Sequence, residues 1–106
     1  MIPELTPTEF VTLRSSGADV VLLDVREPWE LDVARVADIV HIPMGQIAER
    51  LLELDPGRQT VVLCRSGRRS MDIARFLEQK GFKSVANLKG GILAWSQELD
   101  PSLATY

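Results

Sequence analysis

Residues 60–63 form an uninterrupted run of β-branched and aliphatic side chains that ends at Cys64, the only cysteine of the chain. Such a run is typical of a strand that is buried on both faces of a parallel sheet. Ser66 and Gly67 then allow a tight loop, because their side chains are small or absent. Apolar residues at helical spacing follow and predict a helix from about Arg69 to Gly81 (Ile73, Ala74 and Leu77). We therefore expect Cys64 at the carboxyl end of a buried strand.

The alternation of strand and helix patterns continues along the whole chain. Thr6-Pro7-Thr8-Glu9 has the form of a helix-capping box, and Gly17 supplies the stop signal of that first helix. Further strands are expected over residues 20–24, 38–40 and 85–88, and further helices over residues 28–33, 47–54 and 91–99. This alternation implies an α/β fold with a doubly wound, mainly parallel sheet flanked by helices. In such folds the ligand site lies at the carboxyl ends of the strands.

Composition limits the classes of function. The 106 residues, 45% of them hydrophobic, fit a single domain over residues 1–106. A net charge of -3 without a basic stripe argues against a nucleic-acid partner, and no apolar stretch approaches the ~20 residues of a membrane span. One cysteine and one histidine allow neither an internal disulfide nor a structural metal site. We therefore expect a cytoplasmic protein with no membrane partner, no metal and no other cofactor.

The residues around Cys64 predict a reactive thiol. Backbone N–H groups of a curled loop and of a first helical turn point inward together, and Arg65, Arg68 and Arg69 add full positive charge. Both features stabilise a thiolate, so the pKa of Cys64 should lie well below the ~8.5 of a free cysteine. The alternative is an inert core cysteine, which is the commoner case for a lone cysteine. Three cations and a glycine within five positions favour the nucleophile.

The segment Cys64-Arg65-Ser66-Gly67-Arg68-Arg69-Ser70 resembles the active-site loop of the rhodanese family of sulfurtransferases. Other segments resemble further signatures of that family in the same order: Leu22-Leu23-Asp24-Val25-Arg26-Glu27, Ile42-Pro43 and Gly90-Gly91-Ile92-Leu93-Ala94-Trp95. The resemblance implies that Cys64 takes a sulfane sulfur from a donor such as thiosulfate, becomes a persulfide and passes the outer sulfur to cyanide or a thiol. It also implies that the substrate lies against Arg65, Ser66, Gly67, Arg68 and Arg69.

Two alternatives stay open. Phosphatases and arsenate reductases share this fold, but their signature is a cysteine, five residues and an arginine, and that arginine position is Ser70 here. The arginine falls at Arg69, which gives the shorter loop that the resemblance associates with sulfur transfer. A phosphatase would use Arg68 or Arg69 to clamp an oxyanion. The second alternative is a sulfur-relay or docking module for a sulfur-carrier pathway.

One segment departs from the family pattern. Ala34-Arg35-Val36-Ala37-Asp38 stands where the family usually has Gly-His-Ile-Pro-Gly. The loss of both glycines puts the local turn in question, and Arg35 is the candidate for a polar role there.

Other residues are expected to support the site. The resemblance places Asp24 and Arg26 beside the cysteine loop, and we expect Arg26 to form a structural ion pair with Glu27, Glu30 or another acid. Ser70 fits a helix cap better than a hydroxyl donor to the sulfur. His41 is not expected to act as a general base, because a thiolate held by amides needs none.

Residues 100–106 are expected to be unstructured or loosely docked. They resemble the closing residues of rhodanese domains linked to enzymes that activate ubiquitin-like sulfur carriers. The partners that this implies are a sulfur-carrier activating enzyme or a thioredoxin-like protein, besides the small sulfur donors and acceptors.

Overall fold

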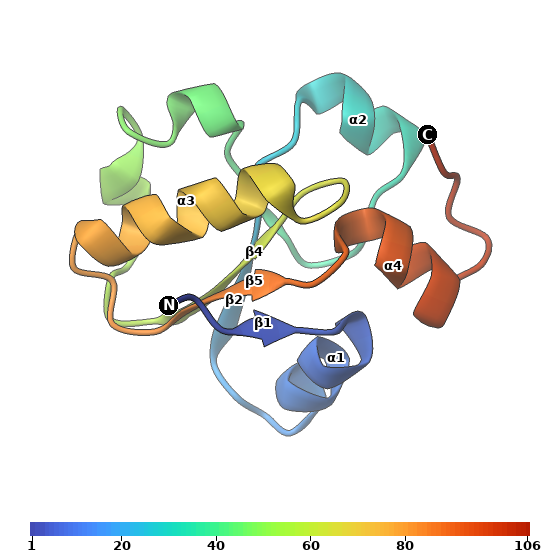
Figure 1. Ribbon diagram of the computed structural model, residues 1–106, viewed down its shortest axis with the longest axis horizontal. Helices are drawn as coiled ribbons and strands as arrows, with labels where there is room; N and C mark the ends of the chain where they lie inside the picture. The colour runs from blue at the N-terminus through green and yellow to red at the C-terminus, as the bar shows by residue number, and fades with distance from the viewer.

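The computed structural model describes residues 1–106, which surround a five-stranded sheet whose strand pairs are all parallel. The strand order is β1-β5-β4-β2-β3, so β4 is the central strand (Figure 1). The strands are β1 (Glu4–Leu5), β2 (Val20–Asp24), β3 (Val40–His41), β4 (Gln59–Leu63) and β5 (Val85–Leu88). The predicted fold class is confirmed.

Helices cover both faces of this sheet. They are α1 (Pro7–Ser15), α2 (Pro28–Val33), α3 (Arg68–Gln79) and α4 (Gly91–Glu98), with α3 on one side of the strands and α1 and α4 on the other (Figure 1). Alternate strand residues point to the two faces. Leu22 and Val61 belong to the apolar cluster with α1 and α4, whereas Leu23 and Val62 belong to the cluster with α3. The doubly wound arrangement therefore has a core on each side of the sheet.

Several local predictions are confirmed. The backbone N–H of Glu9 donates to Thr6 Oγ1 over 3.1 Å, and the N–H of Thr6 donates to Glu9 Oε1 over 2.9 Å, which completes the capping box of α1. Gly17 and Gly81 follow α1 and α3 with φ angles of 90° and 91°. Glycine adopts this left-handed conformation without steric cost.

The helix expected over residues 47–54 is wrong. The chain instead forms two 3-10 helices, Met44–Gln46 and Leu51–Glu53, joined by hydrogen-bonded turns. Ile47 and Leu54 are nevertheless buried in the core beside α3. Their spacing therefore marked the inward-facing positions correctly, because short turns place residues three or four apart on one face as a helix does.

The edges of the sheet also differ from expectation. The two residues of β1 were not predicted, since so short a segment shows no alternation. The strand expected over residues 38–40 begins only at Val40, because Asp38 has a positive φ of 58°. Asp38 stands where the family usually has a glycine, and aspartate tolerates this conformation better than most residues. The turn is thus kept, but Arg35 is exposed without a hydrogen bond or ion pair, so its expected polar role is wrong.

No helix of the structure offers a long enough apolar stretch to cross a bilayer; the longest, α3, has 12 residues.

Candidate active site

Cys64 lies where the sequence predicted it, at the carboxyl end of β4 and before the loop that leads into α3. Gly67 is the residue before the first turn of α3 and has a φ of 98°. A side chain at Gly67 would meet the backbone nitrogen of Gly90 at 3.3 Å. The loop therefore needs glycine here for both its conformation and its close packing.

The sulfur of Cys64 is the acceptor at the centre of this loop. The Gly67 N–H donates to Sγ over 3.1 Å, and the Ser70 hydroxyl lies 3.3 Å from it. Burial raises the pKa of the Cys64 thiol. The opposite effect comes from hydrogen bonds to the sulfur, donated by the Ser70 hydroxyl and by the backbone N–H groups of Ser70, Gly67 and Ser66. The hydrogen bonds outweigh burial, so the pKa of Cys64 lies below its usual value. Cys64 is only 1% exposed, so the thiolate is recessed among these donors.

The loop presents its N–H groups to the sulfur because its carbonyl groups are held elsewhere. At the start of α4, the Ile92 N–H donates to the Cys64 carbonyl over 2.9 Å and the Leu93 N–H donates to the Arg65 carbonyl over 3.1 Å. A Cβ on Gly91 would stand 2.5 Å from the Cys64 carbonyl oxygen. Gly91 thus permits the approach of α4 to the loop, which explains the second glycine of the closing signature.

The three loop arginines have different surroundings. Arg69 makes a bidentate ion pair with Glu30 of α2, with distances of 2.7 and 2.8 Å, and this pair lowers the pKa of Glu30 to about 2. Arg65 donates to the backbone oxygen of Tyr106, and its guanidinium lies 5.2 Å from the centre of the Tyr106 ring. Arg68 alone is exposed without an ion pair or hydrogen bond. Only Arg68 therefore has a free guanidinium for a substrate anion.

Asp24 and Arg26 form a fully buried ion pair behind the site. Arg26 Nη2 lies 2.8 Å from Asp24 Oδ2, and neither side chain is exposed. Arg26 Nη1 also donates to the Tyr106 hydroxyl over 3.0 Å, and that hydroxyl donates to Glu30 Oε1 over 2.9 Å. The ion pair expected for Arg26 is present, with Asp24 as the partner rather than Glu27 or Glu30.

The end of the chain is bound rather than loose. Besides its contacts with Arg26, Glu30 and Arg65, the Tyr106 ring packs against Trp29 with a centroid distance of 5.8 Å. Residues 100–106 therefore run from the end of α4 back to α2 and the cysteine loop (Figure 1). This corrects the expectation of an unstructured or loosely docked tail.

Three polar residues near the loop, Ser70, Ser66 and His41, differ in their local contacts. Ser70 is not the cap of α3, since Gly67 occupies that position and the Ser70 hydroxyl faces the sulfur. Ser66 is exposed and makes no side-chain hydrogen bond. His41 Nε2 donates to the Arg26 carbonyl over 2.6 Å, because a carbonyl can only accept. His41 is thereby engaged outside the cysteine loop.

Sequence reasoning missed Asn87 and Tyr106 as neighbours of the site, and it named Glu30 only as a possible partner of Arg26, not of Arg69. Asn87 donates to the Gly67 carbonyl and accepts from the Ser70 hydroxyl. Its signal was a polar residue within a fully buried strand, since buried amides need partners. Glu30 and Tyr106 gave no such signal, because their positions depend on the tertiary fold.

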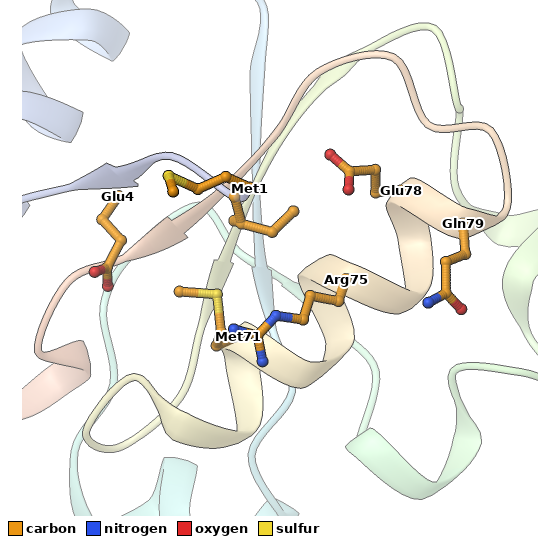
Figure 2. A pocket seen from close by; sticks show the side chains of 7 residues that line it. Met1, Glu4, Met71, Arg75, Glu78 and Gln79 are labelled. Atoms are coloured by element: carbon orange, nitrogen blue, oxygen red, sulfur yellow. The ribbon is translucent and has the colours of Figure 1, made fainter.

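The open hollow in Figure 2 does not contain Cys64. It has a volume of about 450 Å³ and lies between the N-terminal segment and α3, where Met1, Glu4, Met71 and Arg75 line it (Figure 2). No three His, Cys, Asp or Glu side chains gather where they could share a metal ion.

Comparisons with known proteins agree with this geometry. Residues 6–98 match the family described as the rhodanese-like domain. YtwF of Bacillus subtilis is 42% identical over 100 residues, which cover 94% of this chain and 96% of YtwF. A sulfurtransferase of Allochromatium vinosum is 35% identical over 104 residues, which cover 98% and 97% of the two chains. A rhodanese-like domain protein from Staphylococcus aureus has a similar crystal structure, with a TM-score of 0.84, 25% identity and 99% of both chains covered.

Proposed function

This chain is a sulfurtransferase of the rhodanese-like domain family, and we propose that it moves a sulfane sulfur from thiosulfate to cyanide or a thiol through a persulfide on Cys64. The observation that carries the proposal is the recessed sulfur with the Gly67 N–H 3.1 Å away and the Ser70 hydroxyl 3.3 Å away. These donors favour the thiolate, which is the form of cysteine that attacks sulfur.

The proposed reaction has two displacements. The Cys64 thiolate attacks the outer sulfur of thiosulfate, a new S–S bond forms, and the old one breaks with its electron pair on departing sulfite. Cyanide or a thiolate then attacks the outer sulfur of the persulfide, and the electron pair of the broken S–S bond returns to Cys64. No oxidant or proton source is required, since an anion replaces an anion in each step. The loop N–H groups stabilise the negative sulfur before and after each displacement.

The arginine contacts support sulfur transfer over phosphatase or arsenate reductase chemistry. Oxyanion chemistry in a cysteine loop uses a guanidinium as a bidentate clamp on the substrate. Arg69 directs both terminal nitrogens at Glu30, and Arg65 is held by Tyr106. Neither is free to clamp an oxyanion in this arrangement, which leaves only the exposed Arg68 for that task, whereas a small outer sulfur needs only the loop amides.

Intact-mass measurement after treatment with thiosulfate tests the proposal. We expect a gain of one sulfur atom, its removal by cyanide with release of thiocyanate, and no gain in Cys64→Ser. Ser84→Ala is the matched control, because this exposed serine precedes β5, at the end of the sheet away from the cysteine loop, and its side chain makes no hydrogen bond. It should load like the wild type.

Other results would change the assignment. Loading only by a low-molecular-weight persulfide would exclude thiosulfate as the donor but keep persulfide transfer. No loading by either donor, together with hydrolysis of an aryl phosphate, would overturn the proposal in favour of phosphatase chemistry. Stable loading without transfer to cyanide or small thiols would indicate the relay role, in which a sulfur-carrier activating enzyme or a thioredoxin-like protein accepts the sulfur.

A further inference from the structure

Asn87 is a buried amide on β5 whose polar atoms all have partners. It is only 1% exposed. Its Nδ2 group donates to the Gly67 carbonyl over 3.0 Å and to Glu4 Oε2 over 3.1 Å, and its Oδ1 accepts from the Ser70 hydroxyl. Burial of an amide is unfavourable unless such bonds are made. The residue thus connects the edge strand β1, the cysteine loop and α3.

The bond to Gly67 adds to the contacts that hold the loop carbonyls. The Cys64 and Arg65 carbonyls accept from backbone N–H groups of α4, at 2.9 and 3.1 Å. The Gly67 carbonyl accepts from the Asn87 side chain. This contact holds the peptide group that follows Gly67 and so restricts the backbone of the residue whose own N–H donates to Sγ. Of the three, it is the one that a side-chain substitution removes directly.

The Ser70 hydroxyl has two acceptors and one hydrogen. It lies 3.3 Å from Cys64 Sγ and also within hydrogen-bond distance of Asn87 Oδ1. A hydroxyl can donate to only one of them at a time. A charged sulfur is the stronger acceptor, because hydrogen bonds to ionised groups are about twice as strong as neutral ones. Asn87 is the acceptor when the sulfur is uncharged.

We propose that Asn87 is a positioning residue for Cys64: it holds Gly67 so that the N–H of that residue points at the sulfur, and it accepts the Ser70 hydrogen whenever the sulfur is neutral. The inference rests on the proposed function only in taking Cys64 as the nucleophile. The inner sulfur of a Cys64 persulfide carries no charge, so Ser70 would turn to Asn87 after loading and back to the sulfur after transfer.

Alkylation of Cys64 by iodoacetamide across a range of pH tests the positioning role without any sulfur transfer. In Asn87→Leu, a change of similar volume, we expect the rate at neutral pH to fall about tenfold, while the limiting rate at high pH stays within about twofold of the wild type. Such an alkaline shift reports a lost thiolate donor, whereas general damage to the loop would change the limiting rate as well. An unshifted or acid-shifted profile overturns the positioning role.

Two further variants keep the test decisive. Thr60→Val removes a buried hydroxyl from the adjacent strand β4. That hydroxyl bonds only to the Arg58 carbonyl, so its loss should leave the alkylation profile unchanged. Asn87→Ser replaces Asn87→Leu if the latter does not fold. Its side chain is too short to reach the Gly67 carbonyl, so the same alkaline shift is expected.

A double-mutant cycle tests the shared hydrogen. In wild type, Asn87→Leu leaves the sulfur as the sole acceptor of the Ser70 hydrogen, which offsets part of the loss at Gly67. In a Ser70→Ala background this compensation is absent, so the alkaline shift caused by Asn87→Leu should be larger. Equal shifts in both backgrounds would refute the shared hydrogen. If Asn87→Leu causes the alkaline shift but the wild-type protein takes no sulfur from any donor, the proposed function is refuted and the positioning role of Asn87 stands.

Discussion

Arg26→Met leaves a carboxylate in the protein interior without its cation. Asp24 and Arg26 are both 0% exposed, and three of the Arg26 hydrogen bonds to the Asp24 carboxylate come from its guanidinium. Removal of one partner from a buried ion pair costs about 3–5 kcal/mol. A domain of this size has a free energy of unfolding of about 5–15 kcal/mol. With a stability near the middle of that range, about 10 kcal/mol, the variant should lose about a third to a half of its stability while remaining folded in the absence of denaturant.

Urea unfolding followed by tryptophan fluorescence measures this loss, because Trp95 is buried in the core between α1 and α4. With an m-value of about 1.5 kcal/mol per molar urea, the expected loss moves the midpoint down by about 2–3 M. The double variant Asp24→Leu/Arg26→Met removes both charges, and its stability should recover to within about 1 kcal/mol of the wild type.

Persulfide loading by thiosulfate, measured below the unfolding transition, separates structure from catalysis. Arg26 makes no contact with Cys64, so we expect the loading rate of folded Arg26→Met to stay within about threefold of the wild type. A collapse of loading at an unchanged urea midpoint would refute the reasoning. Two results would refute the ion pair as the cause of the lost stability: a loss of less than about 1 kcal/mol in Arg26→Met, or no recovery of stability in Asp24→Leu/Arg26→Met.

Three other substitutions test the contacts around the loop. Gly91→Ala should abolish the rapid alkylation of Cys64 at neutral pH, because the new Cβ would stand 2.5 Å from the Cys64 carbonyl oxygen and displace it. A pH profile like that of the wild type would show instead that α4 moves away without disturbing the loop. Glu30 has a pKa lowered to about 2 by Arg69, so its contribution to stability is complete above about pH 4.5 and is lost as the pH falls toward 2. Urea midpoints in that range should fall less steeply for Glu30→Gln, and equal slopes would contradict the assignment. Tyr106→Phe should lower the free energy of unfolding by about 0.5–2 kcal/mol through loss of the hydroxyl bonds to Arg26 and Glu30, and an unchanged urea midpoint would argue against them.

The nucleophile could be predicted because its signals are local. The apolar run of β4, the glycine that precedes α3 and the cations of the loop lie within a dozen residues, and each has a direct structural meaning. The strand and helix order followed for the same reason, since hydrophobic spacing reports which face is buried. The helix expected over residues 47–54 shows the limit of that signal, because spacing reports burial before it reports backbone conformation.

The role of each arginine could not be predicted from the loop. Arg69 and Glu30 are 39 residues apart, and Arg65 and Tyr106 are 41 apart, so only the folded chain brings them together. Ser70 was misassigned for a similar reason. Its neighbours in sequence suggest a helix cap, but its partners in space are the sulfur and an amide of β5. Side-chain direction in a tight loop depends on contacts that the loop sequence does not contain.

The engagement of Arg65 and Arg69 has a consequence for kinetics. A loop with three free guanidinium groups would attract a dianion from a distance, and its association rate would fall steeply with ionic strength. Arg69 is paired to the Glu30 carboxylate and Arg65 is held in place by Tyr106, so one of the three charges is offset by an ion pair and only Arg68 is free to move toward the approaching donor. The association rate of thiosulfate should therefore fall less steeply with ionic strength than a loop with three free guanidinium groups would give. Once the donor has entered the loop, it interacts mainly with the backbone N–H groups, and salt screens such short contacts only weakly.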